Sequence, residues 1–91
     1  MSATPIEQGR AALRDGDASA ARRAFELALA EVESGEALEG LGEALYLQCD
    51  YPASAAYYGR AYAAFRRERD LMAAGRAART VGWISGNVMG D

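Results

Sequence analysis

The chain has 91 residues, of which 51% are hydrophobic and 25% charged, and a net charge of −3. This length and balance predict one small soluble domain, and the negative charge argues against direct nucleic-acid binding. Histidine and lysine are absent and cysteine occurs once, which excludes an internal disulfide, a Cys/His zinc site and a Ser-His or Cys-His catalytic pair.

In chain order, five helices are predicted, each after a residue whose side-chain oxygen can accept a hydrogen bond from the first free backbone N–H groups. The capping residues are Thr4, Asp17, Ser34, Asp50 and Asp70, and the helices cover about residues 5–15, 18–33, 35–48, 51–69 and 71–86. No segment alternates apolar and polar residues over a useful length, so no strands are expected. The short loops predict antiparallel helix hairpins.

The chain repeats itself with a shift of 33 residues. The aligned sets include Gly9, Gly42 and Gly75; Asp17 and Asp50; Phe25 and Tyr58; Leu38 and Leu71. A glycine inside a helix costs roughly 1 kcal/mol relative to alanine. Three helical glycines in one register therefore predict a close approach between the paired helices of each hairpin.

The second unit of the repeat carries a family pattern in Leu38, Leu41-Gly42, Leu45, Asp50-Tyr51, Ser54, Tyr58 and Ala61. This helix–turn–helix unit resembles the tetratricopeptide repeat, which is about 34 residues long. The resemblance covers about residues 4–85 and departs at Pro5 and Gln8, where the family usually has large hydrophobic residues. It implies an all-α domain of antiparallel hairpins stacked as a right-handed solenoid. The units are about 4–33, 34–69 and a half repeat at 70–91.

A narrower resemblance concerns function. Residues 12–70 are similar to the helical-repeat regions of actinobacterial transcriptional regulators of the LuxR type. The implied role is sensing or assembly, with DNA bound only by a separate helix-turn-helix that is absent here. The half repeat at the end fits a chain that is the N-terminal part of a longer regulator.

The tetratricopeptide resemblance also implies a concave groove lined by the first helix of each pair. The candidate partner-binding residues are Arg10, Arg14, Glu39, Glu43, Tyr46, Arg76 and Arg79, together with Ile6, Leu13, Glu36, Leu47, Met72 and Thr80. A row of glutamates is thus flanked on both sides by arginines. Either these rows neutralise each other and the groove is structural, or it takes a mixed-charge peptide or helix with Tyr46 as an aromatic contact.

Charge is unevenly divided along the chain. Residues 1–51 hold ten acidic residues and four arginines, whereas residues 52–91 hold three acidic residues and six arginines. The two halves could attract each other or a neighbouring copy. The alternative is a pair of solvated faces, since exposed charge pairs contribute little.

Several apolar and aromatic residues remain to be placed. Three tyrosines of the 49–62 stretch, Tyr51, Tyr58 and Tyr62, share one helix face and are predicted to pack, which leaves Tyr57 as the candidate exposed contact. Cys49 is expected to be a small buried hydrophobe. The apolar tail is either core or an exposed patch that makes the chain a dimer; its residues are Trp83, Ile84, Val88 and Met89.

These patterns favour a non-catalytic module that binds a protein or peptide and self-associates. The alternative is a ligand-sensing helical domain, with a small molecule between helices near Tyr46 and Cys49. No catalytic, cofactor-binding or metal-binding residues are identified, and no cofactor or enzymatic activity is expected. No apolar run approaches the roughly 20 residues of a membrane span. The N-terminus also lacks the pattern of a secretory signal, so a cytoplasmic protein without membrane contact is expected.

Overall fold

The computed structural model describes residues 2–90, which form helices and turns with no strand among them. The helices are α1 (Pro5–Arg14), α2 (Ala18–Glu31), α3 (Gly35–Leu47), α4 (Tyr51–Arg67) and α5 (Leu71–Trp83), followed by a π-helical turn, η1 (Ile84–Val88). The predicted all-α class and the five helices are confirmed, with boundaries that shift by at most a few residues.

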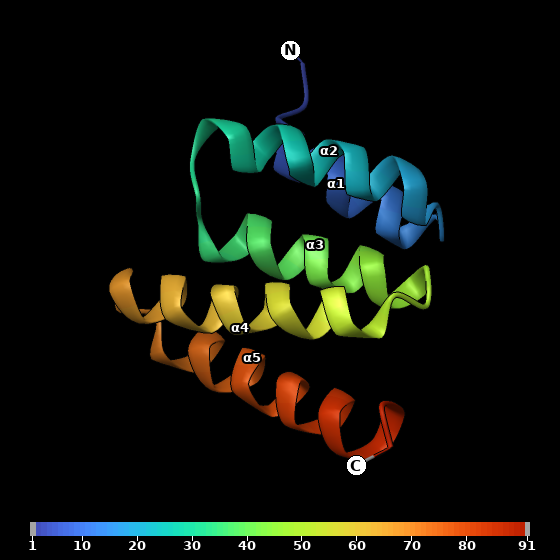
Figure 1. The fold of residues 1–91 in the computed structure, drawn as a ribbon. Helices are drawn as coiled ribbons and strands as arrows, with labels where there is room; N and C mark the ends of the chain where they lie inside the picture. Colours follow the sequence, from blue (N-terminus) through green and yellow to red (C-terminus); the bar gives the residue numbers. More distant parts are fainter. Residues whose placement is uncertain (1, 91) are drawn as a thin grey trace.

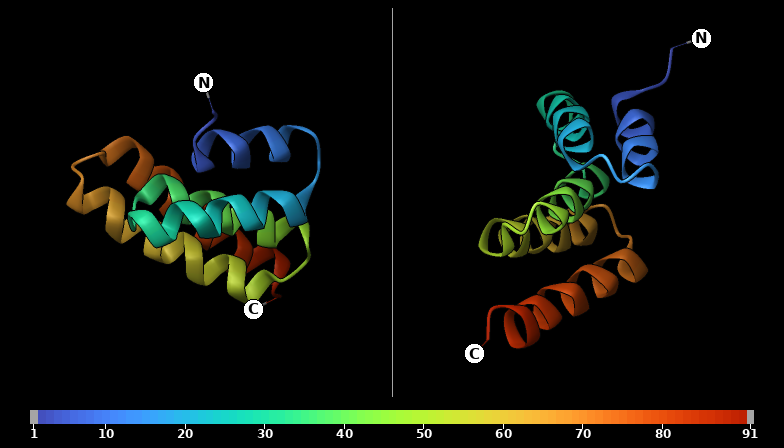
Figure 2. Two further views of the ribbon diagram at one scale, coloured as in Figure 1. Left: turned by 90° about the horizontal axis from the view of Figure 1, so that it is seen from above. Right: turned by 90° about the vertical axis from the view of Figure 1, so that its right-hand side faces the viewer.

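Each helix packs against the next in the chain, and α1 also contacts α3. The helices run in alternating directions in Figure 1, so that consecutive ones form hairpins. Seen from the side in Figure 2, the α1–α2 pair lies above α3 and α4, and α5 lies at the far end. Consequently α5 contacts α4 and η1 but has no following helix beside it within the described residues.

The predicted capping residues all act as caps. Thr4 and Glu7 form a reciprocal capping box, in which Thr4 Oγ1 accepts from the Glu7 N–H at 3.1 Å and Glu7 Oε1 accepts from the Thr4 N–H at 2.8 Å. The hydrogen bond from the Thr4 N–H to the Glu7 carboxylate, helped by the Thr4 hydroxyl, holds the pKa of Glu7 below its usual value. The other four caps each accept from the N–H of an alanine three residues later; they are Asp17, Ser34, Asp50 and Asp70.

The turns after α1, α3 and α4 each contain a residue with left-handed backbone, which is Arg69 in the last of them. Gly16 has φ 74° after α1, and Cys49, at the aligned position, has φ 63° after α3. This conformation ends the helix and directs the Cys49 side chain to solvent. The prediction that Cys49 is buried is therefore wrong, because the residue belongs to a turn and not to a packed helix face.

Aromatic rings pack directly on two of the aligned glycines. A Cβ added to Gly9 would lie 2.7 Å from the Phe25 ring, and one added to Gly42 would lie 2.8 Å from the Tyr58 ring. Phe25 also lies against Gly40 on its other side. The predicted close approach is confirmed for the first two hairpins. At Gly75 an added Cβ would meet only Arg79 Nη1, at 3.4 Å, because no second helix packs there.

The tyrosines of α4 pack more extensively than their spacing indicated. Tyr58 is buried, and Tyr51 and Tyr62 are half-buried, as predicted for packing residues. Tyr57 is also half-buried: it packs against both hydrophobic clusters of the core, and the Arg60 guanidinium lies 5.1 Å above its ring. The prediction of Tyr57 as an exposed contact is wrong, because α4 packs that side of its surface against the preceding helices.

Opposite charges in the two halves of the chain meet, as their uneven distribution suggested. Arg60 and Arg67 approach Glu33 in the α2–α3 loop at 2.9 and 3.9 Å. Glu68, just after α4, accepts from the Gly35 N–H at 2.9 Å and so adds a second acceptor at the start of α3. The end of α4 is thereby tied to the beginning of α3.

Candidate functional site

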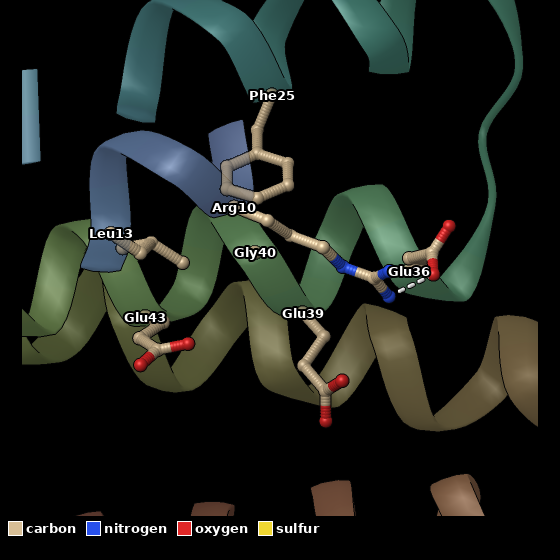
Figure 3. A pocket seen from close by; sticks show the side chains of 7 residues that line it. All are labelled: Arg10, Leu13, Phe25, Glu36, Glu39, Gly40 and Glu43. Carbon is tan, nitrogen blue, oxygen red and sulfur yellow. Dashed lines mark hydrogen bonds and ion pairs between the residues drawn. The ribbon is translucent and has the colours of Figure 1, made fainter. Parts of the chain in front are cut away.

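The candidate groove is built around α3, whose side chains reach both neighbouring first helices. Glu36, Glu39 and Glu43 follow each other at intervals of three and four residues and so lie on one side of α3. In Figure 3, Arg10 extends from α1 to Glu36, whereas Glu39 points in another direction, away from α1. Carboxylates of α3 thus contact Arg10 of α1 and Arg76 of α5, two of the predicted groove arginines.

Two of the glutamates are paired with arginines of the flanking helices. Arg10 donates to Glu36 across the α1–α3 contact. Arg76 of α5 holds Glu39 with two hydrogen bonds, Nε to Oε2 and Nη2 to Oε1, each 2.9 Å long. The paired carboxylate raises the pKa of Arg76. At these two positions the glutamates of α3 and the arginines of the flanking helices therefore neutralise each other, which is one of the two alternatives that the sequence left open. The two hydrogen bonds between Arg76 and Glu39 also connect α5 to α3.

Three charged groove residues make no ion pair within residues 2–90: Arg14, Glu43 and Arg79. Arg14 and Glu43 line one hollow of about 320 Å³, together with Arg10 and Leu13. This hollow shares Arg10, Leu13 and Glu43 with the smaller hollow around Phe25 and Gly40 that Figure 3 shows. Charges of both signs are therefore available to a partner that enters from the α1 side.

Tyr58 of α4 lies close enough to Glu39 and Glu43 for their charges to act on its hydroxyl. Burial raises the pKa of its hydroxyl above the usual value, and the charges of Glu43 and Glu39 act in the same direction, while Arg76 opposes them. The hydroxyl therefore stays protonated beside the carboxylates and can serve as a neutral hydrogen-bond donor.

A cluster of three aromatic rings lies beyond the C-terminal end of the row of glutamates on α3. The Tyr46 ring meets the Tyr51 ring edge-on, with centroids 5.3 Å apart, and the Trp83 ring at 6.1 Å. Trp83 is 52% exposed, so it presents a large apolar surface next to the predicted aromatic contact. Sequence reasoning placed Trp83 in a different surface; no spacing signal links it to Tyr46, because they are on helices separated by all of α4.

The predicted self-association patch is divided by the structure. Ile84 is fully buried and Val88 is half-buried, whereas Trp83 and Met89, at 39%, are exposed. The patch is divided because one side of η1, which begins at Ile84, packs against α4 and α5. Ile84 therefore belongs to the core, which corrects its assignment to an exposed surface.

A comparison of the chain with protein-family models, curated proteins and solved structures finds no match.

Metal ions, a membrane and a small molecule are the other candidate partners of these residues. Within residues 2–90, no group of three histidine, cysteine, aspartate or glutamate residues is arranged to hold a metal ion. No described helix combines the length and apolarity needed to cross a bilayer. Cys49, which was expected beside a small molecule between helices, lies instead on the exposed α3–α4 turn.

Proposed function

We propose that this chain is a non-catalytic protein-interaction module, a tetratricopeptide-like right-handed solenoid whose α1–α3–α5 face binds a mixed-charge peptide or helix. The observation that carries the proposal is the half-exposed Trp83 ring beside Tyr46. The same face also holds charged side chains that make no ion pair within residues 2–90. Large aromatic side chains with exposed surface are typical anchors of protein interfaces.

The chemistry of the partner follows from what the groove leaves unpaired. Since Arg10 and Arg76 are already engaged by glutamates, a partner finds Arg14 and Arg79 as cations and Glu43 as an anion. A peptide with acidic residues for the arginines, a basic residue for Glu43 and an apolar residue against Trp83 satisfies all of them.

The wider context proposed for this module is a bacterial transcriptional regulator of the LuxR type. This part of the proposal rests only on the resemblance of residues 12–70 to the helical-repeat regions of such regulators. In that context the module serves assembly or sensing in the cytoplasm, and DNA is contacted by another region. Self-association of the chain stays a prediction, which light scattering over a concentration series measures directly.

Selection from a displayed library of random short peptides tests the binding proposal. We expect enrichment of peptides that combine an acidic, a basic and an apolar residue. In isothermal titration, Trp83→Ala and Glu43→Gln should weaken such a peptide roughly tenfold or more. The matched control is Arg23→Ala, which removes an exposed charge from α2, outside the groove, and should leave the affinity unchanged. If the selected peptides bind both groove variants as tightly as the unmodified protein, the proposal is contradicted.

A further inference from the structure

One polar group of the core has no partner inside the protein. Tyr58 is only 8% exposed, and the hydrogen bonds among residues 2–90 include none of its hydroxyl, whereas the Tyr62 hydroxyl accepts from Arg66. None of the described side-chain nitrogen and oxygen atoms is both enclosed and without a partner. The Tyr58 oxygen therefore reaches the surface although its ring is buried, and it is free to bond a group from outside.

The first repeat shows that this hydroxyl is not needed for packing. Phe25 occupies the aligned position, and its buried ring lies between Gly9 of α1 and Gly40 of α3. The Tyr58 ring packs on Gly42 of α3 in a similar way. The hydroxyl is thus the chemical difference between two aligned rings, and packing alone does not account for it.

The charges around the hydroxyl favour a positively charged partner group. Those of Glu43 and Glu39 act on it, and so does that of Arg76, which already gives two N–H groups to Glu39. Glu43 makes no ion pair within residues 2–90. One negative charge is therefore left uncompensated close to a hydroxyl oxygen that can accept a hydrogen bond.

Aromatic surface adjoins these two acceptors. Tyr46 follows Glu43 by three residues, so it lies about one turn further along α3, and it is also close to the Tyr58 hydroxyl. The exposed Trp83 ring lies against Tyr46. Aromatic rings attract cations and offer an apolar contact to the long stem of a basic side chain. Both parts of such a side chain are thus matched.

We propose that Glu43 and the Tyr58 hydroxyl together hold a basic side chain, arginine or lysine, of the bound peptide. Its N–H groups donate to the Glu43 carboxylate and to the Tyr58 oxygen, and its stem lies against Tyr46. An apolar residue on the same face of the peptide then contacts Trp83. The inference rests on the proposed function and deepens it, because it gives a core tyrosine the role of selecting the basic residue.

Peptide selection with two proteins tests this role. A displayed library of random short peptides is selected against the unmodified chain and against Tyr58→Phe. This variant loses only the hydroxyl, and Phe25 shows that a phenylalanine ring packs well on a helical glycine. We expect the unmodified chain to enrich peptides with a basic residue near an apolar one. Tyr58→Phe should keep the apolar and acidic preferences and show a weaker basic preference.

Isothermal titration then measures the effect with one peptide from the first selection and with its variant that carries methionine at the basic position. Tyr58→Phe should weaken the basic peptide roughly tenfold, because a hydrogen bond to a charged group is lost. The methionine peptide, which has no N–H group there, should bind both proteins equally. Tyr57→Phe is the matched control: it removes a hydroxyl from the preceding residue, whose ring packs against the core clusters, and should leave both affinities unchanged.

A second variant keeps the test independent of the core. Glu43→Gln, at an exposed position, should weaken the basic peptide and not the methionine peptide. The inference alone is overturned if Tyr58→Phe, shown to be folded by circular dichroism, weakens both peptides equally or neither. It is also overturned if both selections give the same basic preference. If neither protein enriches any peptide, the proposed function fails, and the inference fails with it.

Discussion

Gly16 and Cys49 occupy the same place in successive repeats and share a left-handed backbone conformation, with φ 74° and 63°. Glycine adopts this conformation freely, whereas a residue with a Cβ does so at a cost of about 1 kcal/mol. An added Cβ at Gly16 meets no other atom within 4 Å, so packing plays no part at this turn. The two positions therefore isolate the conformational preference of one residue.

Exchanging the residue types should change stability in opposite directions. We expect Cys49→Gly to raise the free energy of unfolding by up to ~1 kcal/mol and Gly16→Ala to lower it by ~1 kcal/mol. Urea denaturation followed by circular dichroism measures both. A loss of stability in Cys49→Gly would show that contacts of the thiol outweigh the backbone strain.

At the scale of helix pairs, glycines determine how closely the helices approach. Phe25 fits between Gly9 of α1 and Gly40 of α3, and Tyr58 fits on Gly42. Each ring thereby fills space that a methyl group would otherwise occupy, so the cost of glycine in a helix is offset by closer packing. Where no ring is present, as at Gly75, the cost of glycine has no such compensation within the described residues.

Alanine at the two aligned positions distinguishes these situations. Gly42→Ala should destabilise the protein by about 1–3 kcal/mol, since the Tyr58 ring lies 2.8 Å from the new Cβ. Gly75→Ala should instead stabilise it by up to ~1 kcal/mol through helix propensity. Thermal and urea unfolding of the two variants test this, and equal effects at both sites would refute the role of the ring.

At the scale of the whole molecule, ion pairs link the acidic first half of the chain to the basic second half. Arg76 fixes α5 to α3 through Glu39, and Arg60 fixes α4 to the loop before α3 through Glu33. Tyr58 lies close to the charges of Glu43, Glu39 and Arg76. Burial raises the pKa of its hydroxyl, so that ionisation is easier in the unfolded chain than in the folded one. Global stability is therefore linked to the protonation of one core residue.

Because the folded-state pKa of Tyr58 is raised, its favourable contribution is complete below the unfolded-state pKa of about 10 and is lost as the pH rises further. We expect the free energy of unfolding to fall above about pH 10, with a slope of up to ~1.4 kcal/mol per pH unit from this group. Tyr58→Phe should flatten the slope.

Urea titrations between neutral pH and pH 11 compare the two proteins. Tyr51, whose pKa is also raised by the neighbouring Cys49 side chain, should leave a smaller residual slope in the variant. An unchanged slope in Tyr58→Phe would contradict the assignment to Tyr58.

The features predictable from the sequence are those that depend on near neighbours in the chain. Capping by Thr4 or Asp50 requires only a backbone N–H three residues away, so the helices could be placed almost to the residue. The glycine–aromatic register was also accessible, because it repeats after 33 residues. The row of glutamates in the groove could be predicted in the same way, because their spacing places them on one face of α3.

The remaining features depend on how the helices cross. Trp83 meets Tyr46 only after α5 has packed on α4, and Ile84 is buried in the segment that packs against α4 and α5. The sequence alone therefore determined the helices, their ends and the repeat, since these arise from local hydrogen bonds and periodicity. The tertiary structure alone decided which charges are paired, which aromatics face solvent and which face of α5 lies open, because each depends on contacts between residues far apart in the chain.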